Sequence, residues 1–174
     1  PVLVISGCMR NERVGRWIRK QSGGRTRLVH IGRPWAKLDQ FDLIITTPQY
    51  RLPERDNVLH NALTLHRVSA DRLAKEARSW ESRFADLPKP YIGVILGGNS
   101  GPYTLGSKAL ESLFQQASGM ASRCDGSLLV STSARTPRSA AQVLKRNVSV
   151  PHYLYQWQAN DPANPYFAIL ALSD

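Results

Sequence analysis

Cysteine is scarce in this sequence of 174 residues, and long apolar runs are missing from it. The two cysteines, Cys8 and Cys124, are too few for a disulfide framework. They form no CxxC pair and no His/Cys cluster, so the sequence predicts no metal site. The longest apolar runs are Val2–Ile5, Tyr91–Leu96 and Phe167–Leu172, far short of the roughly 20 residues of a membrane-spanning helix. We therefore expect a cytoplasmic protein.

Acidic residues are also few, with 13 Asp and Glu against 23 Lys and Arg and a formal net charge of +10. Most of the excess lies in residues 1–55, which hold 11 basic and 4 acidic side chains. This charge favours phosphate, nucleic acid or an anionic membrane surface as a neighbour, although a solvated basic surface without a ligand explains it equally well. Nucleic acid is the least favoured partner, because no basic stripe is interleaved with aromatic residues.

Apolar segments of strand length alternate with amphipathic segments of helix length along the chain. Strands are predicted over 2–6, 28–31, 43–45, 58–59, 91–96, 127–131 and 152–155. A helix carries Val14, Trp17 and Ile18, and further helices are predicted over 70–84, 105–121, 136–146 and 165–172. Strands separated by helices in this way imply βαβ units, so we expect an α/β fold with parallel sheets.

The segment Leu87-Pro88-Lys89-Pro90 interrupts this alternation and is the best linker in the sequence. It divides the chain into two Rossmann-like pieces, residues 1–88 (in which the helix over 70–84 is a connection) and residues 89–174. Sheets of three or four strands are small for a doubly wound domain. The chain also begins with Pro1 and stops directly after an apolar helix, so we expect a fragment of a longer protein.

The glycine-rich segment Gly97-Gly98-Asn99-Ser100-Gly101 lies between a predicted strand and a predicted helix. Glycines let the backbone approach a ligand, and a helix N-terminus offers N–H groups to a phosphate. A tight turn that binds nothing is the alternative. The next residues are Pro102-Tyr103 rather than GK[ST], which disfavours an ATPase or GTPase. The GxGxxG spacing and the acid expected at the tip of the next strand are also missing, which disfavours a nicotinamide enzyme.

Two further strand-to-helix junctions share this edge of the predicted sheet. Thr132, Ser133, Arg135 and Thr136 follow the next strand and suit a diphosphate, although an ordinary helix cap explains them equally well. Asn164-Pro165-Tyr166 opens the last helix beside them. In the first piece, Ser6, Gly7 and Arg10 form a basic turn, and His66-Arg67 precedes a long helix; each has an equally simple structural explanation. No residue stands out as a catalytic base.

Nine short motifs occur in a fixed order, and together they resemble the mitochondrial fission (elongated mitochondria) family of plants and its bacterial relatives. They are Val4-Ile-Ser-Gly7, Ser22-Gly-Gly-Arg-Thr26, His30-Ile-Gly-Arg-Pro34, Phe41-Asp-Leu43, Asn57-Val-Leu59, Leu65-His-Arg-Val68, Leu96-Gly-Gly-Asn-Ser-Gly101, Ser127-Leu-Leu-Val-Ser-Thr-Ser133 with Arg135-Thr-Pro137, and Asn164-Pro-Tyr166. The resemblance covers essentially the whole chain. Bacterial members are often labelled nucleoside-diphosphate-sugar epimerases or glycosyltransferases.

The resemblance implies a GT-B-like glycosyltransferase, with an acceptor-side piece over 1–88 and a nucleotide-sugar-side piece over 89–174. It implies that the nucleotide-sugar is a substrate and that no metal or other cofactor takes part. The residues that it implies for binding the nucleotide-sugar are Gly97, Gly98, Asn99, Ser100, Gly101, Tyr103, Thr132, Ser133, Arg135, Thr136, Asn164 and Tyr166. It places acceptor contacts at Ser6, Gly7, Arg10, His66 and Arg67; of the Gly-Arg-Arg that relatives carry after the first strand, only Arg10 is kept. The acceptor is not identified, and a lipid-linked or cell-envelope acceptor is one option; from its charge alone, we expect the basic first piece to face an anionic membrane on its inner side. The alternative is a non-catalytic interaction protein with the same fold.

Overall fold

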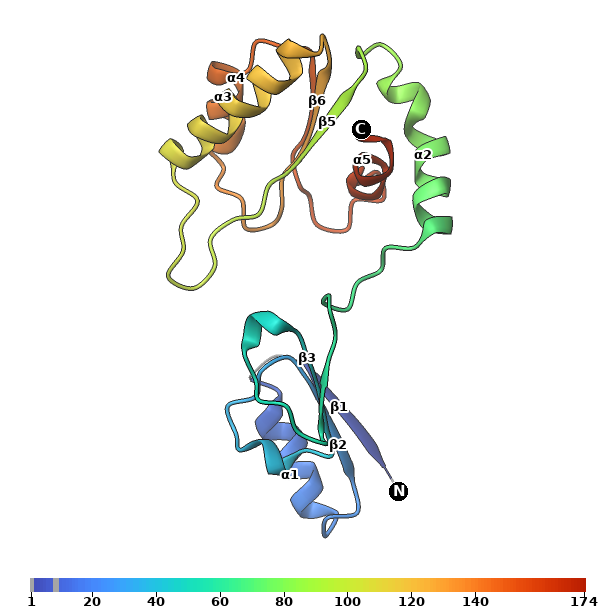
Figure 1. Cartoon of the computed structure of the whole chain (residues 1–174), viewed down its shortest axis with the longest axis vertical. Coiled ribbons are helices and arrows are strands. Elements are labelled where there is room, and N and C mark those ends of the chain that lie inside the picture. Colours follow the sequence, from blue (N-terminus) through green and yellow to red (C-terminus); the bar gives the residue numbers. More distant parts are fainter. Residues whose placement is uncertain (1, 8–9) are drawn as a thin grey trace. The chain divides into compact units, whose positions relative to one another are not determined.

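The computed structural model describes residues 2–7 and 10–174, which form two compact units, Pro1–Arg67 and Val68–Asp174. Cys8 and Met9 of the first turn lie outside the described residues. Both units contain a parallel sheet with helices packed on it (Figure 1). The expected α/β fold with two Rossmann-like pieces is confirmed.

Unit 1 contains a four-stranded parallel sheet in the order β1-β2-β3-β4. Its elements are β1 (Leu3–Gly7), α1 (Glu12–Gln21), β2 (Arg27–Ile31), the 3-10 turn η1 (Leu38–Gln40), β3 (Leu43–Thr46), the 3-10 turn η2 (Pro48–Tyr50) and β4 (Val58–His60). Helix α1 packs on β1 and β2, and Leu28, Phe41, Ile44 and Val58 form the core. Gly15 of α1 lies against the side chain of Leu28, so the helix approaches the sheet closely.

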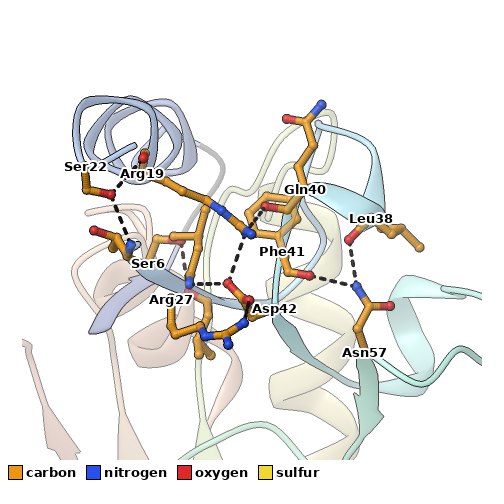
Figure 2. Close-up of polar contacts among 12 residues, drawn as sticks. Ser6, Arg19, Ser22, Arg27, Leu38, Gln40, Phe41, Asp42 and Asn57 are labelled. Carbon is orange, nitrogen blue, oxygen red and sulfur yellow. Dashed lines mark hydrogen bonds and ion pairs between the residues drawn. The ribbon is translucent and has the colours of Figure 1, made fainter. Parts of the chain in front are cut away.

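Asp42 holds the amino end of β2 to the turn before β3 (Figure 2). Its carboxylate accepts hydrogen bonds from the backbone N–H of Leu28 at 2.8 Å, from Arg19 at 3.0 Å and from Arg27 at 2.7 Å. Burial would raise the pKa of Asp42, but these donors and the two guanidinium charges outweigh burial and hold the pKa below its usual value. This network ties α1 to two strands.

Unit 2 contains a three-stranded parallel sheet in the order β5-β6-β7. Its elements are α2 (Ala70–Phe84), β5 (Tyr91–Ile95), α3 (Ser107–Arg123), β6 (Ser127–Ser131), α4 (Ala140–Asn147), β7 (His152–Tyr155) and α5 (Tyr166–Leu172). Helices α3 and α4 cover one face of the sheet, and α2 and α5 cover the other (Figure 1). The central strand β6 is buried along its whole length, as its apolar sequence requires.

Helix α2 packs within unit 2, where Trp80 and Phe84 join Leu129 of β6 and Ile169 of α5 in one cluster. The sequence-based division placed this helix with residues 1–88 as a connection. The compact units instead divide between Arg67 and Val68. The physical reason is the apolar face of α2, which buries its aromatic side chains against α5.

Candidate functional site

The glycine loop connects β5 to α3 and is exposed along most of its length. Ser100 and Tyr103 exchange backbone hydrogen bonds of 2.9 and 3.1 Å around a tight turn, in which Gly101 has a φ of +57°. Asn99 Oδ1 accepts a hydrogen bond from the backbone N–H of Leu105 at 2.8 Å. The loop is therefore a structured turn, and the Asn99 oxygen holds it in shape.

Gly98 brings this loop against the segment that follows β6. A Cβ on Gly98 would overlap the carbonyl group of Arg135 and the backbone nitrogen of Thr136. The backbone N–H of Asn99 also donates a hydrogen bond of 3.3 Å to the Arg135 carbonyl oxygen. The structure thus joins two of the predicted binding segments at the carboxyl edge of the sheet, where parallel α/β sheets place their ligands.

The hydroxyl of Thr136 stabilises this junction. Its Oγ1 accepts a hydrogen bond of 2.8 Å from the backbone N–H of Ser133 and lies 2.5 Å from the Gly97 carbonyl oxygen, to which it donates. Ser133 Oγ lies 3.1 Å from the same Thr136 oxygen. Thr136 therefore shapes the junction, while the Arg135 side chain is exposed at its surface.

A cavity of about 280 Å³ lies beside this junction. It is lined by Thr132, Ser133, Ala134, Thr136, Pro137, Arg138, Ala140, Ala141, Gln156 and Trp157. Three predicted binding residues, Thr132, Ser133 and Thr136, are among them. Sequence reasoning missed Gln156 and Trp157, although their position directly after β7 put them at the same sheet edge. The backbone N–H of Trp157 donates a hydrogen bond of 2.7 Å to Thr132 Oγ1, and the Trp157 side chain is 41% exposed.

Asn164 and Tyr166 lie at the start of α5 rather than in the lining of this cavity. Asn164 Oδ1 accepts a hydrogen bond of 3.0 Å from the backbone N–H of Tyr166 and so stabilises the turn that leads into the helix. The loop before it is fixed by Tyr155, whose hydroxyl donates to Asp161 at 2.8 Å. Burial raises the pKa of Tyr155, and the bond to Asp161 raises it further, so the phenol remains a donor.

The five predicted acceptor-side residues are spread over unit 1. Ser6 is buried, and its Oγ lies 2.9 Å from Nδ1 of His30. Gly7 lines a second cavity, at the carboxyl edge of the first sheet. Arg10, His66 and Arg67 are exposed, and they are not among the described residues that line that cavity.

Among residues 2–7 and 10–174, no group of three or more His, Cys, Asp and Glu side chains is arranged to hold a metal ion. No helix in the same ranges is long and apolar enough to cross a membrane.

The fold, together with the loops at the carboxyl edges of its sheets, is that of an α/β protein built from two Rossmann-like units. The family model described as mitochondrial fission ELM1 matches residues 1–174, and the chain belongs to this family. The chain is 26% identical over 195 residues to the mitochondrial fission protein ELM1 of Arabidopsis thaliana. This match covers 99% of the chain but 45% of the relative, so the chain spans less than half the length of that relative. No solved structure matches the chain. The resemblance inferred from the motifs is confirmed at the level of the family.

Proposed function

We propose that unit 2 binds a nucleoside-diphosphate-sugar at the carboxyl edge of its sheet, and that the protein transfers the sugar to an acceptor. The observation that carries this proposal is the contact of Gly98 with the Arg135 backbone, which joins the glycine loop and the hydroxyl-bearing segment 132–136 beside one cavity. A ligand there meets backbone N–H groups, hydroxyls and guanidinium groups within a short distance.

The diphosphate and the nucleobase of a nucleotide-sugar each have candidate partners in the loops and helix ends of unit 2. The N-cap of α3 is Gly106, which leaves the first backbone N–H groups of a 17-residue helix for an anion. Arg135 and Arg138 are exposed and add positive charge for a diphosphate. The exposed indole of Trp157 offers a face on which a nucleobase stacks.

The reaction proposed is a sugar transfer in which the leaving diphosphate is stabilised by helix ends and arginines rather than by a metal ion. The nucleotide-sugar is then a substrate, and the protein uses no cofactor. The acceptor is lipid-linked or part of the cell envelope. The location that goes with this function is the cytoplasm, and the basic excess of residues 1–55 supports contact with an anionic membrane surface. Salt-sensitive binding to vesicles that contain an anionic lipid tests this placement; equal binding at low and high salt, or no binding, contradicts it.

A thermal-unfolding experiment tests the ligand. UDP-, GDP-, CMP- and dTDP-sugars are added singly, and one of them should stabilise the protein by about 2.7 kcal/mol at 100 times its dissociation constant. Arg138→Gln and Trp157→Leu should each reduce this stabilisation. Arg146→Gln removes the same charge from an exposed position near the far end of α4 and serves as the control. If no nucleotide-sugar stabilises the protein, the proposal fails, and a non-catalytic interaction protein with the same fold becomes the better interpretation.

A further inference from the structure

A larger cavity, of about 640 Å³, lies at the carboxyl edge of the sheet in unit 1. Residues at or just after the ends of all four strands line it, together with the segment 63–65 that follows β4. Its volume falls within the range of pockets that hold small organic molecules. Gly7 is the one predicted acceptor-side residue among the described residues of its lining, and the motif His30-Ile-Gly-Arg-Pro34 contributes four more residues.

Three residues in its lining carry a buried polar atom without a hydrogen-bond partner among the described residues. They are His30, Thr46 and Thr47, which are 0%, 2% and 8% exposed. The atoms are His30 Nε2, Thr46 Oγ1 and Thr47 Oγ1; the one other such atom in the described chain is Nε of Arg16. Folded proteins pair nearly all buried polar groups, because an unpaired one is costly. A ligand or an ordered water molecule that paired these three atoms would remove that cost.

His30 is held in one orientation. Its Nδ1 lies 2.9 Å from Ser6 Oγ, which also lies 3.3 Å from the carbonyl oxygen of Val29, and its ring packs on Phe41 at 5.4 Å between centroids. Ser6 has one proton, so both contacts are hydrogen bonds only if Ser6 donates to Val29 and Nδ1–H of His30 donates to Ser6. In this tautomer Nε2 carries a lone pair that accepts a hydrogen bond, whereas in the other tautomer Nε2–H donates one, so a hydroxyl group suits either form of the ring.

The polar end of the cavity is neutral. Burial lowers the pKa of His30 and outweighs the Glu12 carboxylate and the Arg33 backbone, which both favour the protonated ring. The Thr46 and Thr47 hydroxyls are uncharged. A neutral group that both donates and accepts hydrogen bonds, such as a hydroxyl, satisfies these atoms without the cost of burying a charge.

The rest of the lining is mainly apolar. Leu63, Leu65 and Tyr50 contribute to it, and the two leucines are 70% and 62% exposed. Arg33 bridges part of the rim by donating a hydrogen bond of 2.9 Å to the Tyr50 carbonyl oxygen. Glu12 of α1 fixes the next residues, because its carboxylate accepts hydrogen bonds from the backbone N–H groups of Trp35 and Ala36 at 2.6 and 2.9 Å.

We propose that this cavity binds a neutral amphiphilic molecule, with a hydroxyl at His30, Thr46 and Thr47 and an apolar body against Leu63, Leu65 and Tyr50. The proposal concerns unit 1 alone and does not depend on nucleotide-sugar binding in unit 2. It names a second ligand site with its own chemistry.

Three probes of similar size test the proposal on the whole chain by NMR titration, with the ring nitrogens of His30 as reporters. They are 3-phenylpropan-1-ol, its methyl ether and 3-phenylpropanoate. The alcohol should bind saturably and shift the His30 Nε2 resonance. The ether lacks the donor for Nε2 and should bind about tenfold more weakly. The carboxylate should also bind more weakly, because it brings a charge to a neutral, desolvated site.

The double variant Thr46→Val, Thr47→Val keeps the shape of both side chains and should weaken alcohol binding about tenfold without loss of folding. Thr26→Val is the matched control, since Thr26 is equally buried but precedes β2 at the opposite end of the sheet. Absence of saturable binding by any probe would mean that water alone fills the cavity and would overturn the proposal. Tighter binding of the carboxylate, or an alcohol affinity unchanged by the double variant, would overturn it as well.

Discussion

Gly98 and Arg135 touch through their backbones, and the contact leaves no space for a side chain on Gly98. The Gly98→Ala substitution must therefore push the glycine loop away from the segment after β6. We expect a loss of about 1–3 kcal/mol in the free energy of unfolding of unit 2, as for other overpacked sites. Urea unfolding followed by amide hydrogen exchange in β5, β6 and β7 measures this loss.

The neighbouring glycine supplies the control for this experiment. A Cβ on Gly97 meets nothing within 4 Å among the described residues, so Gly97→Ala should change the unfolding free energy by less than about 0.5 kcal/mol. Equal losses in the two variants would contradict a specific contact between Gly98 and Arg135.

These two glycines also show how far the sequence leads. The glycine loop and the Ser133–Thr136 segment were predicted to share a sheet edge, because adjacent parallel strands end on the same side, and the structure places them together. The prediction that Thr136 caps a helix beginning at Pro137 is wrong, since α4 begins at Ala140. The Thr136 hydroxyl bonds instead to the Gly97 carbonyl oxygen, a partner that local sequence cannot reveal.

The cavity of unit 1 could not be predicted from the sequence either, because it too depends on contacts between residues that are distant in the chain. His30 of β2 and Thr46 of β3 look like ordinary strand residues, and Thr47 directly follows β3. Their common property, a buried polar atom without a partner in the described chain, depends on side-chain packing. The strands themselves were predictable, because buried parallel strands carry continuous apolar runs.

Asp42 should contribute strongly to the stability of unit 1. Asp42→Asn replaces a carboxylate that accepts hydrogen bonds from two arginines and from Leu28, and we expect a loss of about 1–3 kcal/mol. Asp39→Asn, at an exposed position in η1, should have little effect and is the matched control. The pKa of Asp42 is lower in the folded protein than its usual value of 3.8. Its contribution to the free energy of unfolding is therefore fully present above pH 3.8 and is lost as the pH falls through the lowered pKa of the folded state. A wild-type acid-unfolding curve that Asp42→Asn leaves unchanged would contradict this assignment.

His30 should make unit 1 less stable in mildly acidic solution. Burial lowers its pKa below the usual 6.5 despite Glu12 and Arg33, so in the unfolded chain His30 takes up a proton at a higher pH than in the folded chain. The free energy of unfolding should then fall as the pH drops below about 6.5. This slope should be smaller in His30→Asn, and it should persist in His60→Asn, which changes an exposed histidine of the same unit. Denaturant unfolding between pH 7 and pH 5 measures it, and identical slopes in wild type and His30→Asn would refute the prediction.

The place of α2 in unit 2 leads to a prediction that distinguishes the two units. Phe84 is fully buried, and its ring packs on Trp80, Tyr91 and Tyr153 with centroids 5.6, 6.3 and 5.1 Å away. Phe84→Ala should cost about 3–5 kcal/mol and should lower hydrogen-exchange protection in β5, β6, β7 and α5, while β1, β2 and β3 keep theirs. Leu28→Ala, which leaves a cavity in the core of unit 1, should lower protection in β1, β2 and β3 and leave β5, β6, β7 and α5 protected. If Phe84→Ala instead exposed the strands of unit 1, α2 would belong with residues 1–67, and the division of the chain between Arg67 and Val68 would have to be abandoned.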